Sequence, residues 1–439
     1  MTRVGAVLAP MLGRIATLAL LAVIVPAIPS RAADVARERF DNGVTVIVRE
    51  NPLAPVVALS LLVKSGVRWE QADVAGISNF VTAVMVKGTT KRGGAEIAEA
   101  IAALGGKITA AGDVDYSEIR ASALARFWRE MLELTAELAL QPKLAPDEVD
   151  RERELILGRV QRRADNAPSR AFDEFFRALY APHPYGLATL GTPESLKRID
   201  AAAIVARYRT FWRPERMVLA VSGQVSAPEV IAEARRLFAA VPRGSAAPDP
   251  PIAPPAVAVH RVQIDQAAQQ AQIVVGALAP PLDHPDHAAV KVLGSVLGGG
   301  MGGRLFAELR DRRGLAYTAS TFYEPTREPG ALILYLGTAP ENATAAEAAL
   351  LAEIERVKTT LVSAEELRRA KGYLLGAYTL DRRTNARQAW YLAFYESVGV
   401  GLDYPERFRK AVEAVTAEDV RRVARTYLGT LTTVVLRPR

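Results

Sequence analysis

Histidines and aspartates gather at one point of the sequence, where they could share a metal ion. His284 and His287 stand three residues apart in the segment His-Pro-Asp-His, and Asp283 and Asp286 lie beside them. Two imidazoles at this spacing can bind one metal, but a third fixed ligand is not evident. The competing interpretation, which we favour, is a solvated turn in which an aspartate or histidine caps the next helix.

A second group follows shortly afterwards. The segment LGGGMGGR, Leu297–Arg304, lacks the following lysine and hydroxyl residue of a phosphate-binding loop, so it predicts a loop that a peptide backbone can approach or a structural turn. Arg310 and Tyr317 then stand seven residues apart in ELRDRRGLAYTAS. Taken alone, they indicate a helix-surface arginine paired with Glu308 or Asp311 and a tyrosine in a strand core.

Composition restricts the classes of protein that can carry these residues. The 439 residues are half hydrophobic, which predicts a globular chain of two or more domains. Cysteine is absent, so disulfides and thiol chemistry are excluded. The formal charge of +7 falls to +4 without Arg3, Arg14 and Arg31, and the other basic residues alternate with acids. That pattern does not indicate nucleic-acid binding.

The first residues differ from the rest of the chain. A basic start is followed by the uncharged run Ile15–Ser30, which contains Pro26 and Pro29 and is shorter than the roughly 20 residues that span a membrane. This pattern predicts a secretory signal peptide over 1–33, with a retained anchor as the alternative. We therefore expect a periplasmic protein that has no membrane segment after cleavage.

The elements that must position the chemical groups are strands and helices in mixed order. The apolar runs VTVIVREN, VVALSLLVKSG, MVLAVSG, QIVVGALA, ALILYLGT and TTVVLRP predict strands. Apolar residues at helical spacing predict helices at Ala95–Leu104, Arg126–Leu140, Ala145–Arg163 and Ala345–Thr359. We expect an α+β fold in which helices cover one face of mainly antiparallel sheets.

The two halves of the chain repeat each other. LAPDEVDRERELILG matches VSAEELRRAKGYLLG 218 residues later, and IDAAAIVARYRTFWRPERMVLAV matches VTAEDVRRVARTYLGTLTTVVLR at an offset of 216. Such self-similarity predicts an internal duplication and two tandem homologous α/β sandwich domains. The proline-rich segment 241–260 predicts a linker. The expected domains are therefore 34–240 and 261–439.

Five segments carry a resemblance to a known family. The chain resembles the pitrilysin/insulinase family, which includes the subunits of the mitochondrial processing peptidase, over nearly all of its mature length. The resemblance rests on SGVRWEQADVAGISNFVTAVMVKGTTKR, LGGKITAAGDVDYSEIRASAL, DRERELILGRVQRRADNAPSRAFD, HPYGLATLGTPESLKRID and VLGGGMGGRLFAELRDRRGLAYTAS. His183, in the HPYG turn, is expected to be structural.

The resemblance places a zinc motif on residues that cannot bind zinc. The family's H-x-x-E-H helix corresponds to Gly76–Thr90, with Asn79 and Ala83 at the histidine positions and Thr82 at the glutamate that acts as base. Arg159 stands at the downstream glutamate ligand. Asparagine is a poor zinc ligand, alanine has no donor, and arginine adds a fixed positive charge. We therefore expect no metal and a core helix.

Other parts of the family's site are retained. Arg310 and Tyr317 match an arginine and a tyrosine that in active relatives hydrogen-bond the substrate carbonyl and its developing oxyanion. Ala110 and Asp115 match the strand that holds a substrate peptide by β-augmentation. Thr109 replaces the family's usual asparagine there.

The resemblance implies a partner. Some family members are heterodimers in which one subunit holds zinc and the other supplies the arginine and tyrosine. We expect this chain to be the zinc-less subunit of such a peptidase, with peptide substrates and a homologous partner that has an intact H-x-x-E-H. Alone it would not be a zinc peptidase. The alternative is a non-enzymatic, peptide-binding or structural scaffold, and an independent hydrolase lacks a nucleophile and base.

Overall fold

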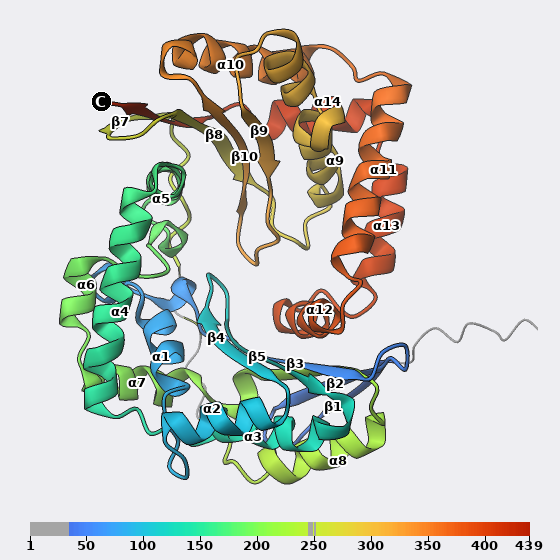
Figure 1. Cartoon of the computed structure of the whole chain (residues 1–439). Helices are drawn as coiled ribbons and strands as arrows, with labels where there is room; N and C mark the ends of the chain where they lie inside the picture. The colour runs from blue at the N-terminus through green and yellow to red at the C-terminus, as the bar shows by residue number, and fades with distance from the viewer. Residues whose placement is uncertain (1–34, 245–248, 250–251) are drawn as a thin grey trace, which may run out of the picture.

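The computed structural model describes residues 35–244, 249 and 252–439, so the expected signal peptide lies outside the described residues. Two β-sheets, one from each half of the chain, form the framework (Figure 1). Within the described ranges, no helix is long and apolar enough to cross a membrane. The predicted α+β class is confirmed.

The N-terminal sheet has six strands in the order β1-β2-β6-β3-β5-β4. All neighbours are antiparallel except β2 and β6. The strands are β1 (Val35–Arg39), β2 (Thr45–Glu50), β3 (Val56–Val63), β4 (Lys107–Gly112), β5 (Ser117–Leu124) and β6 (Met217–Gly223). The helices of this half are α1 (Ile77–Met85), α2 (Gly94–Ala103), α3 (Trp128–Leu140), α4 (Pro146–Asp165), α5 (Ala167–Tyr180), α6 (Pro193–Arg198), α7 (Ala201–Phe211) and α8 (Ala227–Phe238).

The C-terminal sheet repeats this arrangement with the order β7-β11-β8-β10-β9, and its one parallel pair, β7 and β11, corresponds to β2 and β6. Apart from the additional strand β1, the two sheets have the same strand order, which confirms the predicted duplication. The strands are β7 (His260–Gln266), β8 (Ala271–Ala279), β9 (Thr318–Phe322), β10 (Gly330–Thr338) and β11 (Thr432–Pro438). The helices are α9 (His287–Gly298), α10 (Ala343–Thr359), α11 (Ala364–Asp381), α12 (Asn385–Val398), α13 (Tyr404–Ala414) and α14 (Ala417–Tyr427).

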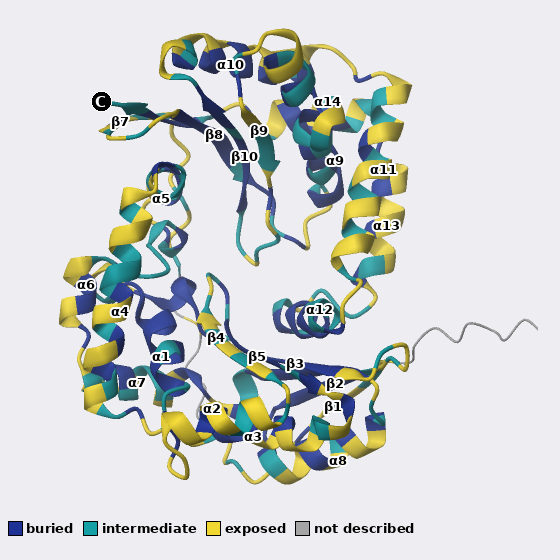
Figure 2. Cartoon of the chain, viewed as in Figure 1, coloured by how far each residue is buried: buried dark blue, intermediate teal, exposed yellow. Residues whose placement is uncertain are grey.

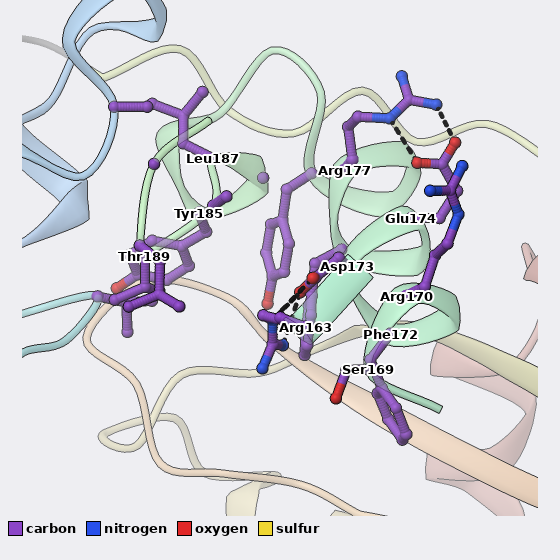
Figure 3. Close-up of a pocket in the computed structure, with 18 of the residues that line it drawn as sticks. Arg163, Ser169, Arg170, Phe172, Asp173, Glu174, Arg177, Tyr185, Leu187 and Thr189 are labelled. Atoms are coloured by element: carbon purple, nitrogen blue, oxygen red, sulfur yellow. Dashed lines mark hydrogen bonds and ion pairs between the residues drawn. The ribbon is translucent and has the colours of Figure 1, made fainter. Parts of the chain in front are cut away.

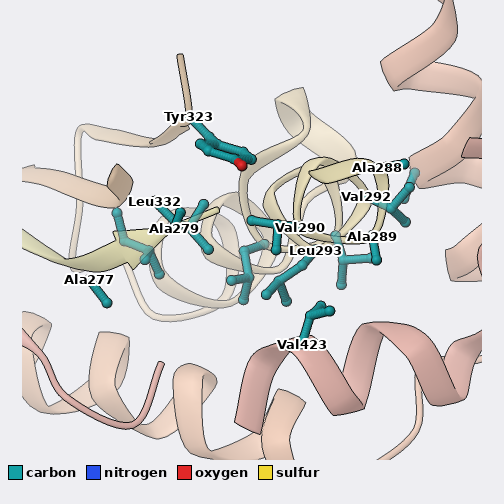
Figure 4. Close-up of a cluster of buried hydrophobic side chains, with 14 of the residues drawn as sticks. Ala277, Ala279, Ala288, Ala289, Val290, Val292, Leu293, Tyr323, Leu332 and Val423 are labelled. Carbon is teal, nitrogen blue, oxygen red and sulfur yellow. The ribbon is translucent and has the colours of Figure 1, made fainter. Parts of the chain in front are cut away.

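Each sheet has a hydrophobic core against helices of its own half. Because side chains alternate along a strand, Leu59 and Val221 face the core that contains α3 and α8, whereas Leu62 and Ala220 face the opposite side. In the C-terminal half, α9 packs between the sheet and α14, and Figure 4 shows Val290, Leu293 and Val423 among this cluster.

The other face of each sheet is covered by a helix from the other half. Helix α5 packs on β8 and β11 of the C-terminal sheet, and α12 packs on β3 and β6 of the N-terminal sheet. Figure 1 shows α12 lying over the N-terminal sheet, and Figure 2 shows that the surfaces in contact are buried. The expectation that helices cover only one sheet face is therefore wrong. Each half can receive a helix from the other half because its central strands are apolar on both faces.

Candidate functional site

Helix α1 is held at its N-terminus by the buried carboxylate of Glu70 and by the half-buried Arg207. The carboxylate of Glu70 accepts hydrogen bonds from the backbone N–H of Gly76 at 2.7 Å and of Ser78 at 2.8 Å. Arg207 donates to the Ser78 hydroxyl at 2.8 Å and stacks on Phe211, with 3.8 Å from Cζ to the ring centre. An anion at a helix N-terminus is favourable. These contacts fix the helix that carries the degenerate motif.

The motif residues of α1 are used in packing. The Thr82 hydroxyl donates to the Asn79 carbonyl at 2.7 Å, and Thr82 is fully buried. The side-chain nitrogen of Asn79 is buried and has no hydrogen-bond partner among the described residues. Ala83 is half-buried against the N-terminal core. The predicted core helix is confirmed and spans Ile77–Met85.

Helix α4, which packs against α1 and carries the position of the family's downstream zinc ligand, contains a salt-bridged glutamate. Glu152 is 4% exposed, and Lys87 lies 2.7 Å from it. Arg159 lies 3.9 Å from the other oxygen of Glu152. The carboxylate that remains is therefore neutralised by cations of the protein itself, and an arginine stands at the ligand position. Together with Ala83, which offers no donor atom, these residues do not fit a zinc ion.

Strand β4 lies beside this helix at the edge of the sheet. Gly112 approaches α1 so closely that a Cβ atom there would lie 2.8 Å from the backbone nitrogen of Asn79. Thr109 is exposed, Ala110 is half-buried, and β5 is the only strand paired with β4 in the described part of the chain. An open edge can accept another strand. The position of Thr109 and Ala110 therefore permits β-augmentation.

Asp115, in the turn after β4, joins the two halves. Its carboxylate accepts hydrogen bonds from the Tyr185 hydroxyl and from the backbone N–H of Arg327, the latter at 2.9 Å. Burial raises the pKa of Asp115, while these two donors act in the opposite direction. Nearby, Arg68 forms an ion pair with Glu328 at 2.6 Å. The turn after β4 is thus tied to the turn between β9 and β10.

Arg310 and Tyr317 lie in the other half of the structure, away from α1. Arg310 belongs to the π-helical segment Phe306–Arg312, is exposed, and lies 4.7 Å over the Phe306 ring. Glu308 pairs with Arg312 and not with Arg310. Tyr317 directly precedes β9 and is 59% exposed. The alternative of a surface ion pair and a core tyrosine is therefore wrong.

No hydrogen bond or ion pair connects these two residues with Asn79, Thr82 or Arg159 within the described residues. The structure brings α1, α4 and β4 together, and it leaves the arginine and tyrosine exposed in the C-terminal half, on the π-helical segment and just before β9.

The histidines take structural positions. His287 is the first residue of α9 and is buried, with its Nδ1 2.9 Å from the Tyr323 hydroxyl. His284 Nδ1 accepts the backbone N–H of Asp286, and the Asp286 carboxylate pairs with Arg422. The expected side-chain cap of this helix is wrong, because Asp286 makes no capping hydrogen bond. In residues 35–244, 249 and 252–439, no group of three or more possible metal ligands occurs.

One residue of the site, Lys87, was not identified from the sequence, and another, His183, was. Lys87 follows α1 in the segment Val-Lys-Gly, and only its distance to Glu152 shows that it occupies the metal region. His183 was expected to be structural, and its Nδ1 accepts the backbone N–H of Tyr185 at 3.1 Å. That expectation is confirmed.

The fold and site define a class: a duplicated α/β sandwich with a peptidase-type edge strand and a metal helix without ligands. Residues 45–193 match the model of insulinase, peptidase family M16, and residues 198–374 match that of the peptidase M16 inactive domain. The chain belongs to the peptidase M16 family, as the resemblance predicted. Arg310 and Tyr317 lie in the second range, and the degenerate helix in the first.

Relatives and solved structures agree with this assignment. An uncharacterized zinc protease of Mycobacterium leprae is 30% identical over 80% of each chain, and one of Mycobacterium tuberculosis is 28% identical over 92% of this chain and 93% of that protein. A peptidase M16 inactive domain from Pseudomonas fluorescens has a TM-score of 0.85 at 24% identity, covering 92% and 98% of the chains. A Helicobacter pylori protease has a TM-score of 0.87 at 22% identity, covering 92% and 100%.

Proposed function

We propose that this chain is the zinc-less subunit of a heterodimeric, periplasmic zinc peptidase and supplies Arg310 and Tyr317 to the active site of a homologous partner. The observation that carries the proposal is their exposure without a competing partner: neither side chain makes a hydrogen bond or ion pair within the described residues. Both side chains therefore have hydrogen-bond donors that can reach a group outside this chain.

The geometry of the N-terminal half supports the same arrangement, in which zinc is held by the partner and this chain supplies the arginine and the tyrosine. Lys87 and Arg159 stand near Glu152, at the position that corresponds to the family's zinc site, so zinc-dependent peptide hydrolysis would need a metal held by another subunit. In the proposed complex, zinc in the partner subunit would polarise the peptide carbonyl and activate water. Arg310 and Tyr317 would donate hydrogen bonds to the carbonyl oxygen as negative charge develops there.

Peptide binding by β4 is the second contribution that we propose. Thr109 and Ala110 lie on an edge strand with an open side, which can hold an extended peptide through backbone hydrogen bonds. Such binding tolerates varied sequences. It is also the observation that favours the alternative function, a peptide-binding protein that never meets a catalytic partner.

Mutation of the arginine tests the proposal. The chain is purified with the homologous zinc subunit from the same organism, and cleavage of a quenched fluorescent peptide is followed. Arg310→Ala should lower kcat by about 10²–10³-fold, the usual effect of removing one oxyanion donor, and Tyr317→Phe should also lower it. Arg312→Ala is the matched control, since Arg312 lies on the same segment but pairs with Glu308.

The two functions give opposite results. Full activity of the Arg310→Ala complex would show that the arginine does not act in catalysis. Peptide binding without any cleavage partner, and unaffected by Arg310→Ala or Tyr317→Phe, would favour the scaffold. Cell fractionation with an antibody against residues after 34 tests the proposed periplasmic location, and recovery only with the cytoplasm would contradict it.

A further inference from the structure

A buried arginine stands at the start of the segment that carries Arg310, and the function proposed above gives it no role. Arg304 is the last residue of the glycine-rich segment and lies two residues before the π-helical segment Phe306–Arg312. It is 8% exposed, whereas Arg310 and Arg313 are exposed. Arginine is rarely buried without a charged partner, because removing the guanidinium from water costs free energy. The partner of Arg304 therefore shows what this residue holds together.

The partner of Arg304 is a glutamate of α11. The Nε atom of Arg304 donates to one carboxylate oxygen of Glu366 at 2.6 Å, and Nη2 donates to the other oxygen at 3.0 Å. Burial alone would raise the pKa of Glu366, but the hydrogen bonds and the charge of Arg304 lower it, so the carboxylate is ionised at neutral pH. A bidentate pair of this kind fixes the orientation of the guanidinium as well as its position. The start of the π-helical segment is thereby attached to α11.

Burial distinguishes this pair from other bidentate pairs of the chain. Figure 3 shows two of those, Arg163 with Asp173 and Arg177 with Glu174, and their arginine side chains are 44% and 64% exposed. Ion pairs in contact with water contribute little to stability. Loss of one partner of a buried pair is costly, because the other charge stays buried without its counter-ion. The pair of Arg304 is of the second kind, so its loss should disturb the segment that it holds.

The same side of the segment also contacts α10. Glu308, four residues after Arg304, lies 3.8 Å from Arg356 of α10. Nη1 of Arg304 and Oε2 of Glu353, which is also on α10, are both buried and have no hydrogen-bond partner within the described residues. Because residues four apart in a helix lie on the same side, Arg304 and Glu308 hold one side of the segment against α10 and α11. A π-helix is rare and occurs mostly at functional sites, so a segment of this type depends on such contacts.

Arg310 lies on another side of the segment. Leu305 and Leu309 are fully buried and fix a second side in the C-terminal core. The Arg310 carbonyl accepts the N–H of Gly314 at 3.1 Å, and the Arg310 guanidinium lies 4.7 Å from the centre of the Phe306 ring. In the part of the chain that the structure describes, Arg310 forms no ion pair of its own. Its direction is therefore set by the contacts that hold the segment.

We propose that Arg304 and Glu366 are positioning residues, which act through the segment Phe306–Arg312 to hold the Arg310 guanidinium where a substrate carbonyl can meet it. The inference rests on the function proposed above for Arg310 and adds a pair that does not itself touch the substrate. Without the pair, the start of the segment loses its attachment to α11. A shift of about 1 Å in a catalytic donor is enough to lower a rate roughly a hundredfold.

Kinetics of the complex with the homologous zinc subunit test the proposal. Arg304→Gln and Glu366→Gln should each lower kcat for the quenched fluorescent peptide by about 10–100-fold and change KM by less than about threefold, because the substrate still binds but meets a misplaced donor. Arg261→Gln is the matched control. Arg261 also makes two hydrogen bonds to a glutamate, Glu347 of α10, but it lies on β7, at the opposite edge of the sheet from β9. This control should keep the kcat of the wild type.

A double-mutant cycle shows whether the pair acts through Arg310. In the Arg310→Ala complex, adding Arg304→Gln should lower kcat by less than about twofold, because the donor that Arg304 positions is already absent. A combined loss equal to the product of the two single losses would show that Arg304 acts independently of Arg310, and it would overturn the proposal. A raised KM with an unchanged kcat in Arg304→Gln would also overturn it.

Hydrogen exchange of the isolated chain gives a result that does not need the partner. In Arg304→Gln and in Glu366→Gln, the amides of residues 306–314 should exchange at least about tenfold faster, while those of β8 and β10 stay unchanged. Unchanged exchange of residues 306–314 would refute the positioning role even where a variant no longer assembles with the zinc subunit. Full activity of the Arg310→Ala complex would refute the proposed function instead. Reduced activity of that complex, together with full activity of both pair variants, would refute only the role of Arg304 and Glu366.

Discussion

Phe175 provides a sharp test of the exchanged helices. It lies in the N-terminal half of the sequence, on α5, but its fully buried ring packs against the C-terminal sheet. The Phe175 ring packs on Gly276 of β8, where a Cβ atom would lie 2.8 Å from the end of the ring. The substitution Phe175→Ala should therefore destabilise a sheet whose first strand begins at His260, 85 residues later.

The expected loss of stability follows from the burial of the Phe175 side chain. Loss of a fully buried phenylalanine forfeits about 2–3 kcal/mol of transfer free energy, and the unfilled cavity brings the total to about 3–5 kcal/mol. Chemical denaturation of the variant should show this loss. Hydrogen exchange should locate it, because amides of β8 and β11, on which α5 packs, should exchange at least about a hundredfold faster.

Phe238→Ala is the matched control. Phe238 is equally buried and lies in the same half of the sequence, but α8 packs on β2 of the N-terminal sheet. Phe238→Ala should accelerate hydrogen exchange of the β2 amides and leave that of the β8 and β11 amides nearly unchanged. If Phe175→Ala instead accelerated the N-terminal strands, or cost less than about 1 kcal/mol, the reciprocal exchange of helices would be incorrect.

Three further predictions concern groups near the site and in the core. Burial lowers the pKa of His287 to about 3, so below pH 6.5 the unfolded chain binds more protons than the folded chain. The free energy of unfolding should therefore fall by up to roughly 4 kcal/mol as the pH drops from about 6.5 to 3. In pH-dependent denaturation, His287→Gln should lack this contribution of the histidine to the pH dependence. Gly112→Ala should cost about 1–3 kcal/mol in thermal unfolding because its Cβ would strike the α1 backbone, whereas Gly88→Ala, with no atom closer than 3.6 Å, should be tolerated. Lys87→Met should lower the free energy of unfolding by about 1–3 kcal/mol, because it leaves the Glu152 carboxylate without its lysine. Adding Glu152→Gln should recover part of this loss. If the effects of the two substitutions were strictly additive, the two residues would not interact.

Most central strands were predictable because their sequences are largely apolar, whereas the inner strand β5, with the sequence SEIRASAL, was not predicted. The runs that became β2, β3, β6, β8, β10 and β11 are buried on both faces, so the local sequence determines the element. The edge strands β1 and β7 alternate polar and apolar residues and carry charges, and they were not predicted as strands. At an edge, pairing with a distant strand decides the conformation.

The assignment of helices to sheets could not be predicted. The amphipathic pattern of α5 shows that this helix buries one face, whereas α12 has buried residues on several sides. Neither pattern identifies the sheet on which the helix packs. The burial of His287 was missed for a similar reason, since its partner Tyr323 comes from a segment 36 residues away. The loss of the metal ligands, by contrast, could be predicted, because ligand chemistry depends on residue type alone.

The contacts between the halves bear on how the retained residues could act together. Asp115, next to the open edge strand, binds the backbone of Arg327, and Arg68 pairs with Glu328 in the same turn. That turn leads through β9 to Tyr317. The path from the peptide edge to the tyrosine thus runs through polar contacts and a strand, and Asp249, in the segment predicted to be a linker, adds an ion pair to Arg68 at 3.3 Å. We expect Glu328→Ala to alter cleavage by the complex more than peptide binding by the isolated chain, because it loosens the placement of Tyr317 and leaves β4 intact.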